Sequence, residues 1–284
     1  MFRHALCFLC RARERTSGGE PMDFSLKGKV ALITGASRGI GEAAALGLDG
    51  LELAPMNPAA LDADALRTTL QQHGLGVAAV ASVSLGLSGL TLLHPDAATA
   101  ARARSRLDDL IAFAGRVGAP LVTIGSFRGR LAGCGPTARR DIVAILREAA
   151  QAAQAAGVRL VLEPMNRFQT DLVTTAAEGL AFVDEVGHPA LGLLLDTCHM
   201  ITEETSWTEP FRQLARAGRL WHVHLADSNR KTPGYGLIDF RPVLGVLREL
   251  GYREYLSIEV FPQPDADTAA RDGVALIRSL LTTT

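Results

Sequence analysis

From residue 28 onward, short β-rich runs alternate with longer helical segments, and this alternation limits the fold more than any other feature. The helical segments carry apolar residues at the 3.6-residue spacing of amphipathic helices, and glycines punctuate their ends. Eight strands alternating with helices predict an α/β fold, either closed as a (β/α)₈ TIM barrel or open and doubly wound, and the count of eight favours the barrel. The predicted strands are Lys29–Thr34, Gly50–Ala54, Val77–Ser82, Leu121–Gly125, Val158–Glu163, Leu191–Asp196, Leu220–Leu225 and Tyr255–Val260, and the predicted helices include Leu61–His73, Ala97–Val117, Thr137–Ala156, Thr174–Val186, Phe240–Leu250 and Asp267–Leu281.

Length and composition are compatible with one such barrel. The chain has 284 residues, of which 48% are hydrophobic, and this is enough for a substantial core. The formal net charge of −1 argues against a nucleic-acid or anionic-membrane surface, and no apolar run approaches the roughly 20 residues of a membrane span. Cys7 and Cys10 have C-x-x-C spacing without a second pair, so they predict neither a zinc site nor a disulfide framework. We expect a cytoplasmic protein with no nucleic-acid or membrane partner.

Residues 1–21 differ from the rest and are interpreted as a leader. They hold several arginines and a short apolar patch, Ala5 to Cys10, without the layout of a signal peptide. Met22 would make a sensible start, so we expect the leader to be disordered or untranslated. Residues 22–284 are expected to form a single barrel domain.

Residues 22–46 make the first βα unit atypical. The stretch KVALITGASRGIG reads as a strand, a glycine-rich turn and a helix start, and it resembles the opening of short-chain dehydrogenases. In that family the glycines let the backbone approach a dinucleotide pyrophosphate at a helix N-terminus. The same turn in a barrel would open at the active-site mouth, where it could hold a substrate phosphate. The matching positions are Thr34, Gly35, Gly39, Ile40 and Gly41.

The rest of the sequence does not support dehydrogenase chemistry. The helix after the turn is cut short near Gly47, and the family's Tyr-x-x-x-Lys pair is missing, since no Lys follows Tyr235, Tyr252 or Tyr255 by four residues. An NAD(P)-dependent oxidoreductase therefore remains only an alternative. A second alternative is an inactive fusion in which the dehydrogenase-like segment prevents the barrel from closing.

Four metal-type side chains end four successive predicted strands. VRLVLE ends in Glu163, LGLLLD in Asp196, LWHVH in His224 and YLSIE in Glu259. Because the C-terminal ends of barrel strands converge on one mouth, we expect these side chains to meet there. Three carboxylates and one imidazole suit Mn²⁺, or alternatively Mg²⁺ or Co²⁺, better than a thiolate-rich zinc site does.

Each of these residues taken alone has an ordinary structural explanation. A carboxylate after a strand often caps a helix or is solvated, and His222 shares a strand face with His224, so one of the two can be a hydrogen-bonded core histidine. Four such groups at the ends of apolar strands would each be an uncompensated polar group unless paired or metal-bound. The combination therefore favours a metal site.

From about Gly47 to Leu281 the sequence resembles the xylose-isomerase-like TIM-barrel superfamily of sugar (phosphate) isomerases and epimerases. It is most similar to the tagatose and related ketose 3-epimerase members. The segments that carry the resemblance are LEPMNR around Glu163, DTCH (Asp196–His199), HVHLADSNR (His222–Arg230), PGYGLIDF (Pro233–Phe240) and LSIEV (Leu256–Val260).

The resemblance implies a mechanism and a set of site residues. It implies that Glu163, Asp196, His224 and Glu259 bind the metal, with the two glutamates also exchanging a proton at the carbon next to the carbonyl of a small ketose or keto-sugar. The metal would polarise the substrate oxygens and stabilise a cis-enediolate. His199 and Arg230 are implied to contact substrate oxygens, and members of the superfamily are often homodimers or homotetramers.

Two positions depart from the family pattern, and one rival lies within the same fold. Gln169 stands where a second Glu is common, and Cys198 stands where an aromatic residue is usual, which puts substrate specificity in doubt. An apurinic endonuclease-like metal hydrolase would share the four ligand positions. It also needs histidines on the early strands and an Asp-x-His motif after His224, and neither is present.

Overall fold

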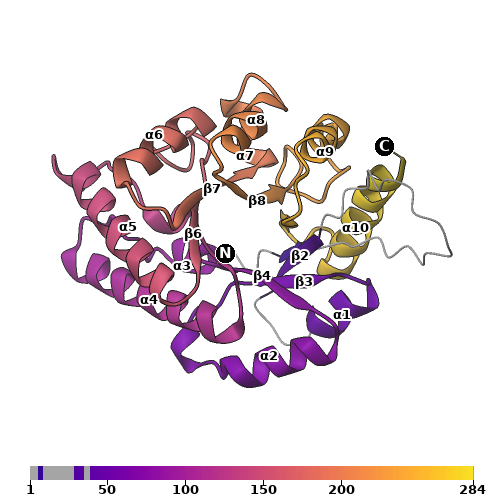
Figure 1. Ribbon diagram of the computed structural model, residues 1–284, viewed down its shortest axis with the longest axis horizontal. Coiled ribbons are helices and arrows are strands. Elements are labelled where there is room, and N and C mark those ends of the chain that lie inside the picture. The colour runs from indigo at the N-terminus through magenta and orange to yellow at the C-terminus, as the bar shows by residue number, and fades with distance from the viewer. Residues whose placement is uncertain (1–5, 9–28, 35–38, 284) are drawn as a thin grey trace.

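The computed structural model describes residues 6–8, 29–34 and 39–283, in which a ring of strands is surrounded by helices (Figure 1). The strands are β1 Leu6–Phe8, β2 Lys29–Thr34, β3 Gly50–Leu53, β4 Gly76–Ala81, β5 Leu121–Ile124, β6 Arg159–Leu162, β7 Leu191–Asp196, β8 Leu220–Leu225 and β9 Tyr255–Val260. The helices are α1 Gly39–Ala45, α2 Ala63–Gln72, α3 Val83–Leu87, α4 Ala97–Val117, α5 Ala138–Ala155, α6 Ala176–Val186, α7 Thr197–Glu203, α8 Glu209–Arg216, α9 Phe240–Glu249 and α10 Ala266–Thr283, with 3₁₀ turns at Pro58–Ala60 and Ser126–Arg128.

The strands from β2 to β9 form a closed parallel ring. Each pairs with the next in chain order, and β9 also pairs with β2, where Val30 lies opposite Leu256. The predicted (β/α)₈ TIM barrel is therefore confirmed, and β2 with α1 supplies its first βα unit. The alternative in which this unit prevents closure is wrong, because the β2 ladders to β3 and β9 are both formed.

Parts of the N-terminal predictions fall outside the described residues. Residues 35–38, which hold most of the glycine-rich turn, lie outside the described residues. The phosphate and dinucleotide hypotheses depend on this turn, so the structure does not test them. Within the predicted leader the structure describes only β1, which pairs antiparallel with β9.

Three short helices were not predicted by the apolar periodicity. They are α3, α7 and α8, with 5, 7 and 8 residues, so each displays at most about two turns of an amphipathic repeat. The long helices follow the prediction closely, because caps mark their ends. The Asp96 side chain accepts the Thr99 N–H at the start of α4, and Gly118 ends that helix in the left-handed conformation at φ 82°.

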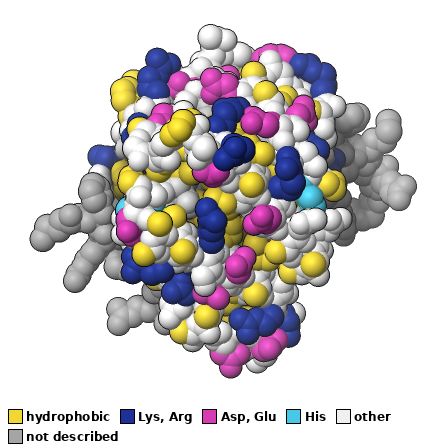
Figure 2. Space-filling model, turned by 90° about the vertical axis from the view of Figure 1, so that its left-hand side faces the viewer, with side chains coloured by type: hydrophobic (Ala, Val, Ile, Leu, Met, Phe, Trp, Pro, Cys, Tyr) yellow, Lys and Arg dark blue, Asp and Glu magenta, His cyan; other side chains and the backbone are white. Residues whose placement is uncertain are grey.

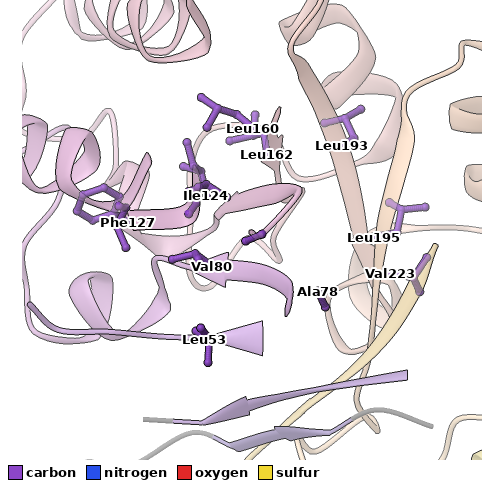
Figure 3. Close-up of a cluster of buried hydrophobic side chains, with 14 of the residues drawn as sticks. Leu53, Ala78, Val80, Ile124, Phe127, Leu160, Leu162, Leu193, Leu195 and Val223 are labelled. Carbon is purple, nitrogen blue, oxygen red and sulfur yellow. The ribbon is translucent and has the colours of Figure 1, made fainter. Parts of the chain in front are cut away.

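Alternating strand residues separate two cores. Leu193, Leu195 and Val223 belong to the main core, which the outer face of the ring forms with helix residues such as Phe182 and Phe211. Figure 3 shows several side chains of this core as sticks, among them Leu193, Leu195 and Val223. A smaller apolar cluster is separate from it and comprises Ala79, Leu121, Val161 and Leu194, which alternate with main-core residues along their strands.

The inward side of β3, β8 and β9 carries buried polar side chains. The unusual part of the fold is the ring interior, where the buried polar residues of these three strands are Glu52, His222, His224, Ser257 and Glu259.

Among the described residues, no helix combines the length and apolarity needed to cross a membrane.

Gly50 lies so close to the neighbouring strand that a side chain there would clash. An added Cβ would lie 2.5 Å from the carbonyl oxygen of Gly76, a backbone atom next to the β3–β4 ladder. We predict that Gly50→Ala lowers the free energy of unfolding by about 1–3 kcal/mol. Urea denaturation monitored by circular dichroism measures this change.

Gly245→Ala in α9 is the matched control. Nothing lies within 4 Å of an added Cβ there, so the substitution is expected to raise the free energy of unfolding by about 0.5–1 kcal/mol. Equal unfolding midpoints for the two variants would contradict the close approach of β3 and β4.

Candidate metal centre

The four predicted ligands lie together at the C-terminal ends of neighbouring strands. Glu163 follows β6 directly, Asp196 is the last residue of β7, and His224 and Glu259 lie near the ends of β8 and β9. One ligand atom from each side chain lies within 4.8 Å of those of the other three, and all four residues are buried. The structure thus brings the predicted set together, although its role in metal binding stays a prediction.

Two atoms of the cluster are buried without a hydrogen-bond partner. His224 Nδ1 lies 2.8 Å from Glu259 Oε2 and 3.9 Å from both Glu163 Oε1 and Asp196 Oδ2, but it forms no aligned hydrogen bond. Glu163 Oε1 also lacks one. An unpaired buried polar atom costs roughly 1–3 kcal/mol, and two that face the same point fit a bound cation. The oxygen-rich donor set suits a hard divalent ion.

The charges of the cluster favour a cation as well. Burial, followed by repulsion from Glu259 and Asp196, raises the pKa of Glu163. Burial also acts to raise the pKa of Glu259, but Arg230 and His224 outweigh it and lower that pKa below its usual range. The three carboxylates therefore cannot all ionise easily without added positive charge, and a divalent ion would supply it while displacing a proton.

A second buried carboxylate orients the predicted ligand histidine, His224. Glu52 Oε2 lies 3.3 Å from His224 Nε2, 2.9 Å from His222 Nε2 and 2.7 Å from Ser257 Oγ. A carboxylate can only accept, so His224 carries its hydrogen on Nε2 and turns Nδ1 toward the other three ligands. His222 is a hydrogen-bonded core histidine, which is one of the two explanations that the sequence left open.

Arg230 adds positive charge at the edge of the cluster. Its guanidinium pairs with Asp196 and lies 2.6 Å from Glu259 Oε2. Its backbone is left-handed at φ 60°, a conformation that costs a non-glycine residue energy. The Arg230 N–H donates to the Asp227 carbonyl, and the Arg230 carbonyl accepts from the Phe261 N–H. These two bonds tie the backbone of Arg230 to its own loop and to the residue after β9. Arg230, predicted as a substrate contact, thus lies beside two predicted ligands.

His199, the other predicted substrate contact, lies on α7 beside Glu163. Its Nε2 is 3.5 Å from Glu163 Oε1, and its Nδ1 is 2.9 Å from the Asn166 amide nitrogen. Burial is the main reason that the pKa of His199 falls to about 4, so the ring is neutral near pH 7. Among the positions that depart from the family pattern, Gln169 is exposed and Cys198 is partly buried.

Arg128 supports the segment that follows Glu163, and sequence reasoning missed it. The side chain is fully buried, and its guanidinium donates to four backbone carbonyls. Burial lowers the pKa of Arg128 to about 10. The bond from its Nη1 to the Glu163 carbonyl is 2.7 Å long and fixes the backbone of a predicted ligand. The carbonyls that it binds belong to Gly125, Glu163, Leu172 and Val173.

The sequence carried a signal for only some of the supporting residues. Glu52 lies in the apolar run GLEL, and a charged residue in such a strand predicts a buried partner. Arg128 follows the predicted strand Leu121–Gly125 by three residues, and no local pattern distinguishes it from a solvated loop residue. A cavity of about 560 Å³ lies elsewhere, beside α3 and α4, and its lining residues include none of the four ligands.

Known sugar epimerases are similar to this chain in sequence and in structure. The L-ribulose 3-epimerase of Mesorhizobium japonicum is 36% identical over 240 residues, covering 82% of this chain and 78% of that protein. The L-ribulose 3-epimerase of Methylomonas sp. is 32% identical over 256 residues, covering 87% and 85%. A solved structure of L-ribulose 3-epimerase matches with a TM-score of 0.77 at 28% identity, covering 90% of this chain and 95% of that one.

The family follows from the match along the sequence. Residues 40–280 match the family described as Xylose isomerase-like TIM barrel, and the chain therefore belongs to that family. Together with the cluster of acidic and histidine ligand atoms, the epimerase relatives support a sugar epimerase, and hence an isomerase, as the enzyme class of this chain.

Glu52→Gln tests the orienting role of Glu52. The amide keeps the shape of the side chain but removes the charge that holds the hydrogen of His224 on Nε2. We predict that Mn²⁺ binds about 10–100-fold more weakly, the usual effect of losing such a partner, as measured by calorimetric titration.

The control for this experiment is Glu249→Gln, the same chemical change at the end of α9, where Glu249 pairs only with Arg212. It should leave the affinity unchanged. An unaltered Mn²⁺ affinity in Glu52→Gln would show that Glu52 does not orient the ligand.

Proposed function

We propose that this protein is a metal-dependent epimerase of a small ketose or keto-sugar, which exchanges a proton at the carbon next to the carbonyl through a cis-enediolate. The observation that carries the proposal is the convergence of Glu163 and Glu259, from separate strands of the ring, on one buried point with Asp196 and His224. Relatives named L-ribulose 3-epimerase, ketose 3-epimerase and D-psicose 3-epimerase support a pentulose or hexulose as the substrate.

The metal proposed for the site is Mn²⁺, with Mg²⁺ or Co²⁺ as alternatives. Glu163, Asp196, His224 and Glu259 would hold it, and three oxygen donors with one imidazole are compatible with each of these ions. When bound, the ion supplies a Lewis acid that makes the hydrogen next to the carbonyl more acidic.

Glu163 and Glu259 are proposed as the acid–base pair. Epimerisation removes a proton from one face of a carbon and returns one to the other face, so it needs two positioned groups. Without a metal, the pKa of Glu163 is raised and that of Glu259 is lowered, so the two carboxyls differ in their affinity for a proton. His199 and Arg230 lie beside this pair and are proposed to hold the substrate oxygens.

Other expectations from the sequence stay predictions. They are a homodimer or homotetramer, a cytoplasmic location, and the absence of nucleic-acid and membrane partners. An apurinic endonuclease-like hydrolase and an NAD(P)-dependent oxidoreductase remain rival activities, and assays with an abasic DNA duplex and with NAD(P)H plus ketose would detect them.

Metal binding is expected to stabilise the fold. Because the ion binds the folded cluster, Mn²⁺ at 100 times its Kd should add about 2.7 kcal/mol to the free energy of unfolding, and EDTA should remove it. Differential scanning calorimetry measures the corresponding rise in Tm. Asp196→Asn, which removes one ligand charge, should lose most of the shift, whereas Gly245→Ala should keep it. A Tm that does not respond to Mn²⁺, Mg²⁺ or Co²⁺ would contradict the metal site.

Proton exchange with solvent tests the proposed chemistry directly. With Mn²⁺ in D₂O, L-ribulose, D-psicose or another ketose should gain deuterium at the carbon next to the carbonyl, as detected by NMR. Glu163→Gln and Glu259→Gln should each lower turnover by at least about 10²-fold, because neither amide can transfer a proton. Glu249→Gln serves as the surface control. A normal rate in Glu259→Gln, or no exchange with any ketose in folded metal-loaded protein, would overturn the mechanism.

A further inference from the structure

We propose that Asn166 is a positioning residue that fixes the tautomer of His199, so that the Nε2 atom of His199 always donates a hydrogen bond and never accepts one. The proposal rests on the proposed function for its kinetic consequence, but the tautomer itself can be measured without any substrate.

The orientation of the Asn166 amide is set by the backbone. Asn166 Oδ1 accepts the N–H of Phe168 at 3.2 Å, closing a turn two residues long. The backbone carbonyl of Asn166 accepts from Gln169 and Thr170, which holds the same turn. With Oδ1 engaged, the amide nitrogen is the atom that faces His199 Nδ1 at 2.9 Å.

This contact determines which ring nitrogen carries the hydrogen. An amide NH₂ group only donates, so His199 Nδ1 must accept and cannot itself carry a hydrogen. An imidazolium would place N–H against N–H, so the contact also excludes the charged ring. A neutral imidazole has one N–H, and that hydrogen must be on Nε2. Both side chains are buried, with 8% of Asn166 and 2% of His199 exposed, so water does not replace this bond.

His199 Nε2 then points its hydrogen at the catalytic cluster. It lies 3.5 Å from Glu163 Oε1, one of the unpaired buried oxygens. A ligand oxygen bound there would be met by a fixed donor, which favours a carbonyl or a developing oxyanion. His224 also carries a hydrogen on Nε2 but faces the cluster with the other nitrogen, because its Nε2 donates to Glu52 and its Nδ1 lies next to the predicted ligands.

Asn166→Asp is the decisive variant. A carboxylate of nearly the same shape accepts instead of donating, so it draws the hydrogen of His199 onto Nδ1 and disfavours the Nε2–H form. Nitrogen-15 NMR of histidine-labelled protein, metal-free and Mg²⁺-loaded, reports the tautomer, and His199→Gln assigns the signal. The wild type should show Nε2–H, and Asn166→Asp should show Nδ1–H or the charged ring.

Kinetics provide the second readout. Losing a donor aimed at a developing charge should lower kcat by about 10²-fold, with KM little changed. Asn57→Asp is the matched control, since it adds the same charge at an exposed position whose oxygen accepts from Arg106, and it should alter neither readout. A charge effect without tautomer control would instead change kcat in Asn166→Asp with the Nε2–H signal retained, which overturns the proposal.

The wild-type spectrum tests the inference even if Asn166→Asp does not fold. An Nδ1–H or charged His199 in the wild type would overturn it. Failure of the proposed epimerase activity would appear separately, as no deuterium exchange with any ketose in a protein whose His199 still shows the Nε2–H form.

Discussion

The concentration of negative charge inside the strand ring is the constraint on which the rest of the site depends. Glu163, Asp196 and Glu259 meet at one buried point, where three ionised carboxylates repel one another and lack water. The fold offsets this with His224 and Arg230, and the raised pKa of Glu163 shows that the compensation is incomplete. A site that remains short of positive charge is one that favours a divalent cation over water.

The residues around the cluster serve mainly to hold this unfavourable arrangement in one geometry. Arg128 uses its donors on backbone carbonyls and so ties the backbone of Glu163 to the neighbouring loop. Thr197 and Ala226 exchange two hydrogen bonds, of 2.7 and 3.0 Å, which join the end of β7 to the end of β8 next to Asp196 and His224. These hydrogen bonds hold the backbone next to Glu163, Asp196 and His224.

The sequence predicted the ring and the four converging side chains because both follow from regular patterns. The apolar runs that end in Glu163, Asp196, His224 and Glu259 follow one another at intervals of about one βα unit. A closed barrel brings the C-terminal ends of such strands together. Glu52 and Asn166 could not be assigned in this way, since their partners, His224 and His199, lie 172 and 33 residues away in the sequence. The short helix α7 was missed for a local reason, because Asp196 serves both as the end of β7 and as the cap that accepts the Cys198 N–H.

The two site histidines show how neighbours of different chemistry give one residue type two roles. Glu52 can only accept, so it holds a hydrogen of His224 on Nε2 and leaves Nδ1 as the atom that can bind a metal after losing its proton. Asn166 donates to His199 and so leaves that ring with a hydrogen directed at the cluster, as an oxyanion donor needs. A carboxylate beside His199 would add a further negative charge to a centre that already has a surplus. A neutral amide sets the tautomer without that cost, which gives a physical reason for Asn at position 166.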